Sequence, residues 1–204
     1  MNPIKQRLAH RHTAQGFTIV EMLLALSGVA FLLLFVVFAI VHVTGLYTKG
    51  IALRQINQTG REVTDELARA IRYGGTVVAP DASNRLCVGG KAYIWNNRGE
   101  TTNKYTDDVP VNFARSDDTS YCADTSKKID PDASTALIGG VATVQKLIIT
   151  RSDPVSPLYS ISLVVSTSGD NAPSLTGTGE YQCDTHFWQY CAFGQFETVV
   201  YARN

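Results

Sequence analysis

A run of twenty uncharged residues, 22–41, constrains this chain more than any other feature of its sequence. Large apolar residues and alanine make up almost all of the run, and only Ser27 and Gly28 soften it. Because an α-helix rises about 1.5 Å per residue, a helix of this length spans roughly 30 Å, the thickness of a bilayer core. A buried helix of a soluble protein rarely needs apolar residues on every face. The run therefore predicts a membrane-spanning helix, which we place at residues 17–43.

Basic residues gather before this run. Lys5, Arg7 and Arg11 precede it without an acidic residue among them, although the whole chain has a formal net charge of zero. Because cytoplasmic flanks of membrane helices are rich in Lys and Arg, we expect the N-terminus in the cytoplasm and the rest of the chain outside. A cleavable secretory signal has a shorter apolar core, roughly 7–15 residues, followed by small residues. Residues 43–45 match such a cleavage site poorly.

All four cysteines, Cys87, Cys122, Cys183 and Cys191, lie after the apolar run. An even number of cysteines beyond a membrane segment indicates an oxidising compartment and two disulfides. Three connectivities are possible, and we favour Cys87–Cys122 with Cys183–Cys191 because these pairings close the shorter loops. Reduced, buried thiols are the alternative. A zinc site is not expected, since neither CxxC nor CxxxC spacing occurs.

An acidic residue, Glu21, stands at the start of the apolar run, where a bilayer disfavours charge. It would either lie at the headgroup boundary or find a cation. The surrounding stretch QGFTIVEMLLAL resembles the type III signal of type IV pilins and of type II secretion pseudopilins. In that family a basic leader ends in Gly, the next residue is usually Phe, and Glu is the fifth residue of the mature chain. Gly16, Phe17 and Glu21 stand in these relative positions, and the resemblance covers about residues 11–45.

The resemblance implies the processing and assembly of this family. A membrane prepilin peptidase would cut between Gly16 and Phe17 and methylate the new Phe17 amine, and Glu21 would pair with the N-terminal amine of a neighbouring subunit. The other implied partners are further pilin subunits, the pilus assembly platform and, before assembly, the membrane. The implied location is the cytoplasmic membrane, crossed once, and then an extracellular pilus. Many major pilins carry a proline within this helix, and its absence here favours a minor pilin or a pseudopilin.

The sequence predicts three parts: a cytoplasmic leader (residues 1–16), a long helix (residues 17–74) and an extracellular β-rich domain (residues 75–204). In the second half of the helix an apolar stripe repeats with spacings of three and four, opposite a charged face. The stripe consists of Leu53, Ile56, Gly60, Val63, Leu67 and Ala70. Gly74-Gly75 provides a stop signal. A membrane anchor followed by a separate soluble helix is the alternative.

Five later segments rich in β-branched and aromatic residues predict strands. They are residues 91–95, 111–115, 144–150, 159–166 and 196–203. Glycine, proline, asparagine, aspartate and serine crowd the intervals between them, as in turns and loops. We therefore expect an α+β fold, pilin-like, in which the long helix packs against an antiparallel β-sheet.

The short loop between Cys183 and Cys191 is rich in rings. It contains His186, Phe187, Trp188 and Tyr190. These side chains would form either an adhesive aromatic patch or ordinary packing against the sheet.

No catalytic motif is present among the common hydrolase, metalloprotease and nucleotide-binding patterns. We therefore expect no enzyme activity and no cofactor. We also expect no metal, because the acidic loops lack the spacing of a calcium site. Scattered cations in the outer region predict no nucleic-acid binding. The expected function is that of a minor structural subunit whose fibre supports adhesion, twitching motility, secretion or DNA uptake. One alternative is a single-pass anchored extracellular binding domain that does not polymerise. Another is a secreted enzyme with its mature terminus near Leu46.

Overall fold

The computed structural model of the chain describes residues 16–75, 77–81, 84–99, 104–105, 113–152, 156–177 and 179–203. The chain divides into two compact units, Met1–Thr44 and Gly45–Asn204, and each is described by itself. The predicted leader, apart from Gly16, lies outside the described residues, as do the first two residues of the strand predicted at 111–115.

A single helix, α1, runs from Ile19 to Tyr73 and contributes residues to both units. It corresponds to the helix predicted at residues 17–74, and it is not divided into an anchor and a separate soluble helix. At its C-terminal end the amide of Gly74 donates to the carbonyl of Ala70 at 2.7 Å. Gly75 then adopts a φ of +78°, a left-handed conformation that glycine accepts without steric cost. The predicted Gly74-Gly75 stop signal is thereby confirmed.

Two antiparallel sheets and one small hairpin form the β-structure of the second unit. The first sheet has five short strands in chain order: β1 (Val77–Asp81), β2 (Arg85–Val88), β3 (Lys91–Trp95), β4 (Phe113–Ser116) and β5 (Thr135–Ile138). The second sheet has the order β10-β7-β6, with longer strands: β6 (Ala142–Arg151), β7 (Leu158–Thr167) and β10 (Phe193–Tyr201). The hairpin pairs β8 (Ser174–Leu175) with β9 (Tyr181–Gln182). The remaining elements are the one-turn helix α2 (Ser120–Ala123) and the 3₁₀ turn η1 (Gly169–Asn171).

The five predicted strands correspond to β3, β4, β6, β7 and β10, but the expectation of a single sheet is wrong. The free edge of β6 shows why the sheets stay separate. The amide of Leu147 donates to the side-chain oxygen of Asn97 at 2.8 Å. At the neighbouring bulge the carbonyl of Gln145 accepts the amide of Arg98 at 3.2 Å. Loop groups thus occupy the hydrogen-bonding positions that a strand of the first sheet would need.

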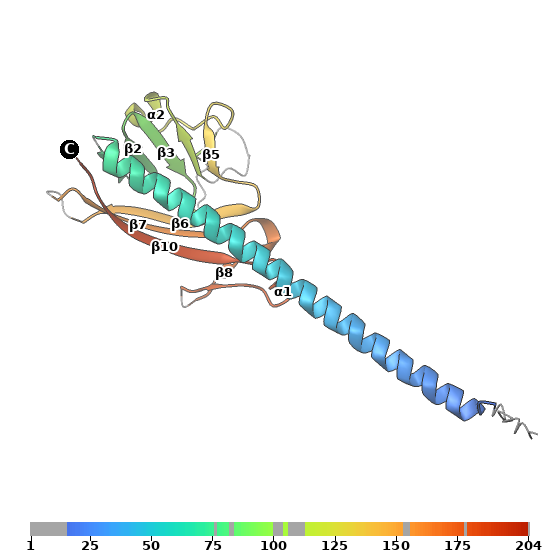
Figure 1. The fold of residues 1–204 in the computed structure, drawn as a ribbon. Coiled ribbons are helices and arrows are strands. Elements are labelled where there is room, and N and C mark those ends of the chain that lie inside the picture. The colour runs from blue at the N-terminus through green and yellow to red at the C-terminus, as the bar shows by residue number, and fades with distance from the viewer. Residues whose placement is uncertain are drawn as a thin grey trace, which may run out of the picture. The chain divides into compact units, whose positions relative to one another are not determined.

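One hydrophobic core joins the second part of α1 to both sheets (Figure 1). The buried face of the helix consists of Ile56, Gly60, Val63, Thr64, Leu67 and Ile71. It follows the predicted stripe at Ile56, Gly60, Val63 and Leu67, but Leu53 is exposed and Ala70 only partly buried, whereas Thr64 and Ile71 are buried. Thr64 is accommodated because its hydroxyl donates to the carbonyl of Gly60 at 2.7 Å. Each large aliphatic side chain on this face contributes about 1.5–3 kcal/mol by its burial, so the helix is an integral part of the folded domain.

Candidate functional site

The start of α1 is closed by two reciprocal hydrogen bonds between Thr18 and Glu21. The amide of Glu21 donates to Thr18 Oγ1 at 3.2 Å, and the amide of Thr18 donates to Glu21 Oε2 at 3.4 Å. The first amides of a helix have no partner within the helix, and this Thr-x-x-Glu arrangement, a capping box, satisfies two of them. This capping role was not predicted, although the spacing of threonine and glutamate just before an apolar run signals it.

The capping box explains why a carboxylate is present at this point. Glu21 lies in the first turn of α1, where the partial positive charge of the helix N-terminus favours an anion by about 0.3–1 kcal/mol. Its side chain remains exposed, as does that of Thr18. The local bonds therefore fix the position of the carboxylate without enclosing it, and they leave a surface that a second group can approach.

Gly16 and Phe17 precede the helix in irregular backbone, and both are exposed. The side chain of Phe17 is 84% exposed, and among the described residues no atom outside the adjoining ones lies within 4 Å of the position that a Cβ would take at Gly16. Exposed, non-helical backbone is the kind of segment that proteases cut. The peptide bond between these two residues is therefore sterically accessible.

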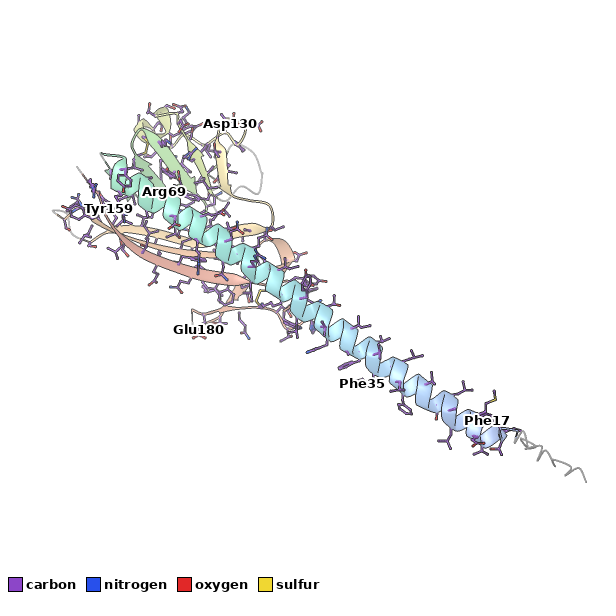
Figure 2. The ribbon with its side chains drawn as sticks, in the orientation of Figure 1. Phe17, Phe35, Arg69, Asp130, Tyr159 and Glu180 are labelled. Atoms are coloured by element: carbon purple, nitrogen blue, oxygen red, sulfur yellow. A yellow bond between two sulfur atoms is a disulfide. The ribbon has the colours of Figure 1, made fainter. Side chains whose placement is uncertain are left out.

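In the part of the chain that the structure describes, the large apolar side chains of the first unit are all exposed. Figure 2 shows Phe17 and Phe35 projecting from the chain into open space at this end. Among the described residues, α1 is the one helix long and apolar enough to cross a membrane, and none of its most apolar window is buried. Soluble monomers rarely expose a contiguous apolar patch larger than a few hundred Å². Such an exposed apolar surface is compatible with a membrane-spanning helix.

The four cysteines form the two pairs favoured by the sequence analysis. Cys87 is bonded to Cys122 and Cys183 to Cys191, with a Cα–Cα distance of 5.8 Å in each pair. Buried Arg85 holds the segment that contains Cys122, since its guanidinium donates hydrogen bonds to backbone carbonyls of residues 121–127. Within the described parts of the chain, no cluster of three histidine, cysteine or acidic side chains could hold a metal ion.

The segment from residue 183 to residue 191, which we call the aromatic loop, is a compact series of turns. The amides of Tyr190 and Cys191 both donate to the carbonyl of Phe187, at 2.9 and 3.1 Å. The loop rests on α1, because Lys49 Nζ donates to the carbonyl of Cys191 and the Trp188 ring lies beside Gly45. Burial at this contact lowers the pKa of the Lys49 amine.

The rings of the aromatic loop remain partly open to solvent. Phe187 and Tyr190 are each 47% exposed and Trp188 is 37% exposed. The contacts named above join the loop to the helix, and Tyr190 also lines a pocket with Val141 and Thr167 at the ends of β6 and β7. The predicted packing against the sheet therefore holds for part of the loop. The adhesive role stays a prediction.

A second polar cluster ties α1 to the first sheet. Arg115 Nη1 lies 2.9 Å from Glu66 Oε1, and Tyr93 donates its hydroxyl to the same oxygen at 3.1 Å. Burial raises the pKa of Glu66, but hydrogen bonds from Arg115 and Tyr93 outweigh it, and the net pKa lies below the ordinary value. Burial and the neighbouring Glu66 carboxylate raise the pKa of Tyr93. The cluster holds helix and sheet together.

Comparison with protein-family models, with curated proteins and with solved structures finds no match to this chain. The class of protein is therefore described from its fold and its candidate site alone. It is an α+β protein whose exposed, apolar N-terminal helix continues into the core of a disulfide-bonded β-rich domain. The helix could span a membrane, and two further features mark its start: an accessible Gly16–Phe17 bond and a capped carboxylate at Glu21.

Proposed function

We propose that this chain is a structural subunit, of the minor kind, of a type IV pilus or a related pseudopilus. It is stored in the cytoplasmic membrane, cut after Gly16 by a prepilin peptidase, and assembled through α1 into an extracellular fibre. The observation that carries the proposal is the joint presence of an exposed apolar helix and of Glu21 five positions beyond Gly16, held at the helix start. The resemblance of residues 11–45 to a prepilin supports the same reading.

Assembly needs no chemical step within the subunit after processing. Leaving the bilayer would expose the apolar face of α1, and packing the same face among the helices of other subunits restores its burial. The fibre thus replaces lipid with protein. The assembly platform and neighbouring pilin subunits are the partners of this step, and the fibre would serve adhesion, twitching motility, secretion or DNA uptake.

The charge on Glu21 sets the register in this proposal. Cleavage creates an ammonium at Phe17, and burying that ammonium or the Glu21 carboxylate alone among helices would be strongly unfavourable. Pairing the Glu21 carboxylate of one subunit with the Phe17 amine of its neighbour removes both costs at once. Because the capping box fixes the carboxylate, only one axial offset between neighbours brings the two charges together.

Mass spectrometry of the N-terminus of protein purified from its native cells tests the processing. We expect a chain that begins with N-methylated Phe17. An intact Met1 would instead support a single-pass anchored binding domain, and a terminus near Leu46 would support a protein released by signal peptidase.

Replacing Glu21 with alanine tests the assembly. We expect normal membrane insertion and a strong decrease in the amount of subunit found by immunogold labelling on sheared surface filaments. Unchanged incorporation of the variant would show that Glu21 has no part in assembly.

A further inference from the structure

We propose that the aromatic loop is a membrane-interface contact. While α1 spans the bilayer, Phe187, Trp188 and Tyr190 rest in the headgroup region of the outer leaflet and hold the domain close to the membrane. This inference rests on the membrane-stored state of the proposed function, and it adds a surface to which the assembly of the fibre assigns no role.

The position of the loop along the chain is the first argument. A Cβ at Gly45 would lie 3.8 Å from Cζ2 of Trp188 and 3.4 Å from Oε1 of Gln189. Gly45 comes two residues after Val43, the last residue of the expected membrane span. Successive Cα atoms are 3.8 Å apart, so the chain itself limits the separation of these two residues to about 8 Å. The Trp188 ring is therefore held at the point where the chain leaves the bilayer.

The attachment of the loop to α1 is firm enough to keep it there. The Cys183–Cys191 disulfide closes the loop, and the ammonium of Lys49, one turn beyond Gly45, donates a hydrogen bond to the Cys191 carbonyl. The turns within the loop supply two further hydrogen bonds to the Phe187 carbonyl. A loop that satisfies these backbone groups internally can meet the headgroup region without leaving them unpaired.

The chemistry of the exposed side chains is the second argument. Tryptophan and tyrosine are enriched at membrane–water interfaces, because one part of each ring is apolar and another part forms hydrogen bonds. Trp188 and Tyr190 are partly exposed, and Leu46 and Tyr47 of α1, beside Gly45 in the chain, are exposed as well. Together with Phe187 they concentrate exposed apolar groups and rings in the part of the chain that directly follows the expected membrane span. Scattered exposed rings would need no explanation, but rings concentrated at this level do.

The loop carries little charge, which identifies the kind of lipid contact. Asp184 is its one acidic residue, and its carboxylate accepts the amide of His186 at 2.8 Å. No lysine or arginine lies between Cys183 and Cys191. The contact therefore depends on partition of the rings into the interface, and we expect it with zwitterionic lipid.

The two tryptophans of the chain make the inference testable by fluorescence. Trp95 is 2% exposed in the core, whereas Trp188 lies in the proposed contact. The full-length chain is placed in phosphatidylcholine vesicles at low protein density, with bromine atoms on the acyl chains either close to the headgroup or close to the chain end. We expect shallow bromines to quench the fluorescence more than deep ones. Trp188→Phe, which leaves only Trp95, should lose this quenching.

Carbonate extraction of the same vesicles measures insertion independently. If the chain is inserted but the bromines do not quench, or if quenching persists in Trp188→Phe, the aromatic loop does not touch lipid and the inference is wrong while the membrane-stored state stands. Stronger quenching by the deep bromines would also refute an interfacial position. Shielding of Trp188 from aqueous quenchers only at high protein density would identify a contact between copies and refute the lipid contact. Failure to insert would overturn the membrane-stored state and the inference together.

Discussion

Thr18 and Glu21 hold each other at the start of α1, each accepting the backbone amide of the other at 3.2–3.4 Å. One side chain thereby has two possible roles, since Glu21 caps the helix and also supplies a charge. A glutamine at this position can still accept the Thr18 amide but has no charge. Capping and charge can therefore be separated experimentally.

Glu21→Gln should impair fibre assembly while leaving the helix start intact. Because the amide oxygen of glutamine also serves in a capping box, the helix content of the full chain in detergent should be unchanged by circular dichroism. The amount of subunit in sheared filaments should fall, since the Phe17 ammonium of the neighbour loses its counter-charge.

Thr18→Ala is the matched variant for that experiment. It removes the hydroxyl that accepts the Glu21 amide but keeps the carboxylate, at a cost of about 1 kcal/mol in helix stability. We expect its incorporation into filaments to remain near that of the unmodified chain. If Thr18→Ala and Glu21→Gln lower incorporation equally, capping and not charge explains the role of Glu21.

Gly60→Ala should destabilise the domain, although alanine is the better helix former. A Cβ at Gly60 would come within 2.0 Å of the Phe196 ring of β10, so the ring must move. Overpacking of this kind costs about 1–3 kcal/mol, against a gain of about 1 kcal/mol in helix propensity. Denaturant unfolding of the full chain in detergent, followed by near-ultraviolet circular dichroism, should show a net decrease in the free energy of unfolding.

Gly50→Ala provides the control on the same helix. Gly50 is exposed, and a Cβ there would have no neighbour within 4 Å among the described residues. This variant should be stabilised by up to about 1 kcal/mol. Equal effects of the two substitutions would show that the contact between Gly60 and Phe196 does not limit the packing of α1 on β10.

The comparison of sequence and structure shows which kinds of information a pattern carries. The length of α1 and its buried face were predictable, because Ile56, Val63 and Leu67 repeat with helical spacing and Gly74-Gly75 marks the end. The periodicity failed at Leu53, which is exposed although the preceding Ala52 packs against the core, and at Thr64, whose hydroxyl is satisfied by the Gly60 carbonyl.

The division into two sheets was not predictable from strand patterns. It depends on Asn97 and Arg98, loop residues that hydrogen-bond to the free edge of β6, and on an extra residue at Gln145. The short strands β1, β2 and β5 were missed because segments of four or five residues carry little periodic signal. At the candidate site Gly16, Phe17 and Glu21 were found by resemblance, whereas the part played by Thr18 required the geometry.

Loss of the Cys87–Cys122 disulfide should cost more stability than loss of Cys183–Cys191. The pairs are separated by 35 and 8 residues, and the entropy of loop closure corresponds to about 4 and 2.5 kcal/mol respectively. Double alanine variants of each pair, unfolded by denaturant under the same conditions, measure the difference. If the shorter loop costs as much as the longer one, contacts of the aromatic loop with α1 contribute more than chain entropy.

The domain should lose stability in acid because the stabilising contribution of the Glu66 carboxylate is lost there. Its pKa in the folded protein lies below the ordinary value of 4.5, so the protonated carboxyl is favoured more in the unfolded chain than in the folded one. The stabilisation is therefore complete above about pH 4.5 and is lost as the pH falls through the pKa of the folded state. The measurement is the free energy of unfolding as a function of pH, from pH 6 downward in steps of about one pH unit. Glu66→Gln should reduce the loss of stability in the acidic part of this curve.

Asp65→Asn is the control, because Asp65 is the preceding residue of the same helix and is exposed. It removes one negative charge without touching the contacts of Glu66 with Arg115 and Tyr93. Because the contacts of Glu66 are kept, we expect the curve of Asp65→Asn to differ from that of the unmodified chain less than the curve of Glu66→Gln does. Parallel curves for Glu66→Gln and the unmodified chain would contradict this prediction. They would mean that removing the Glu66 carboxylate leaves the number of protons bound on unfolding unchanged, and therefore that the ion pair does not link helix and sheet.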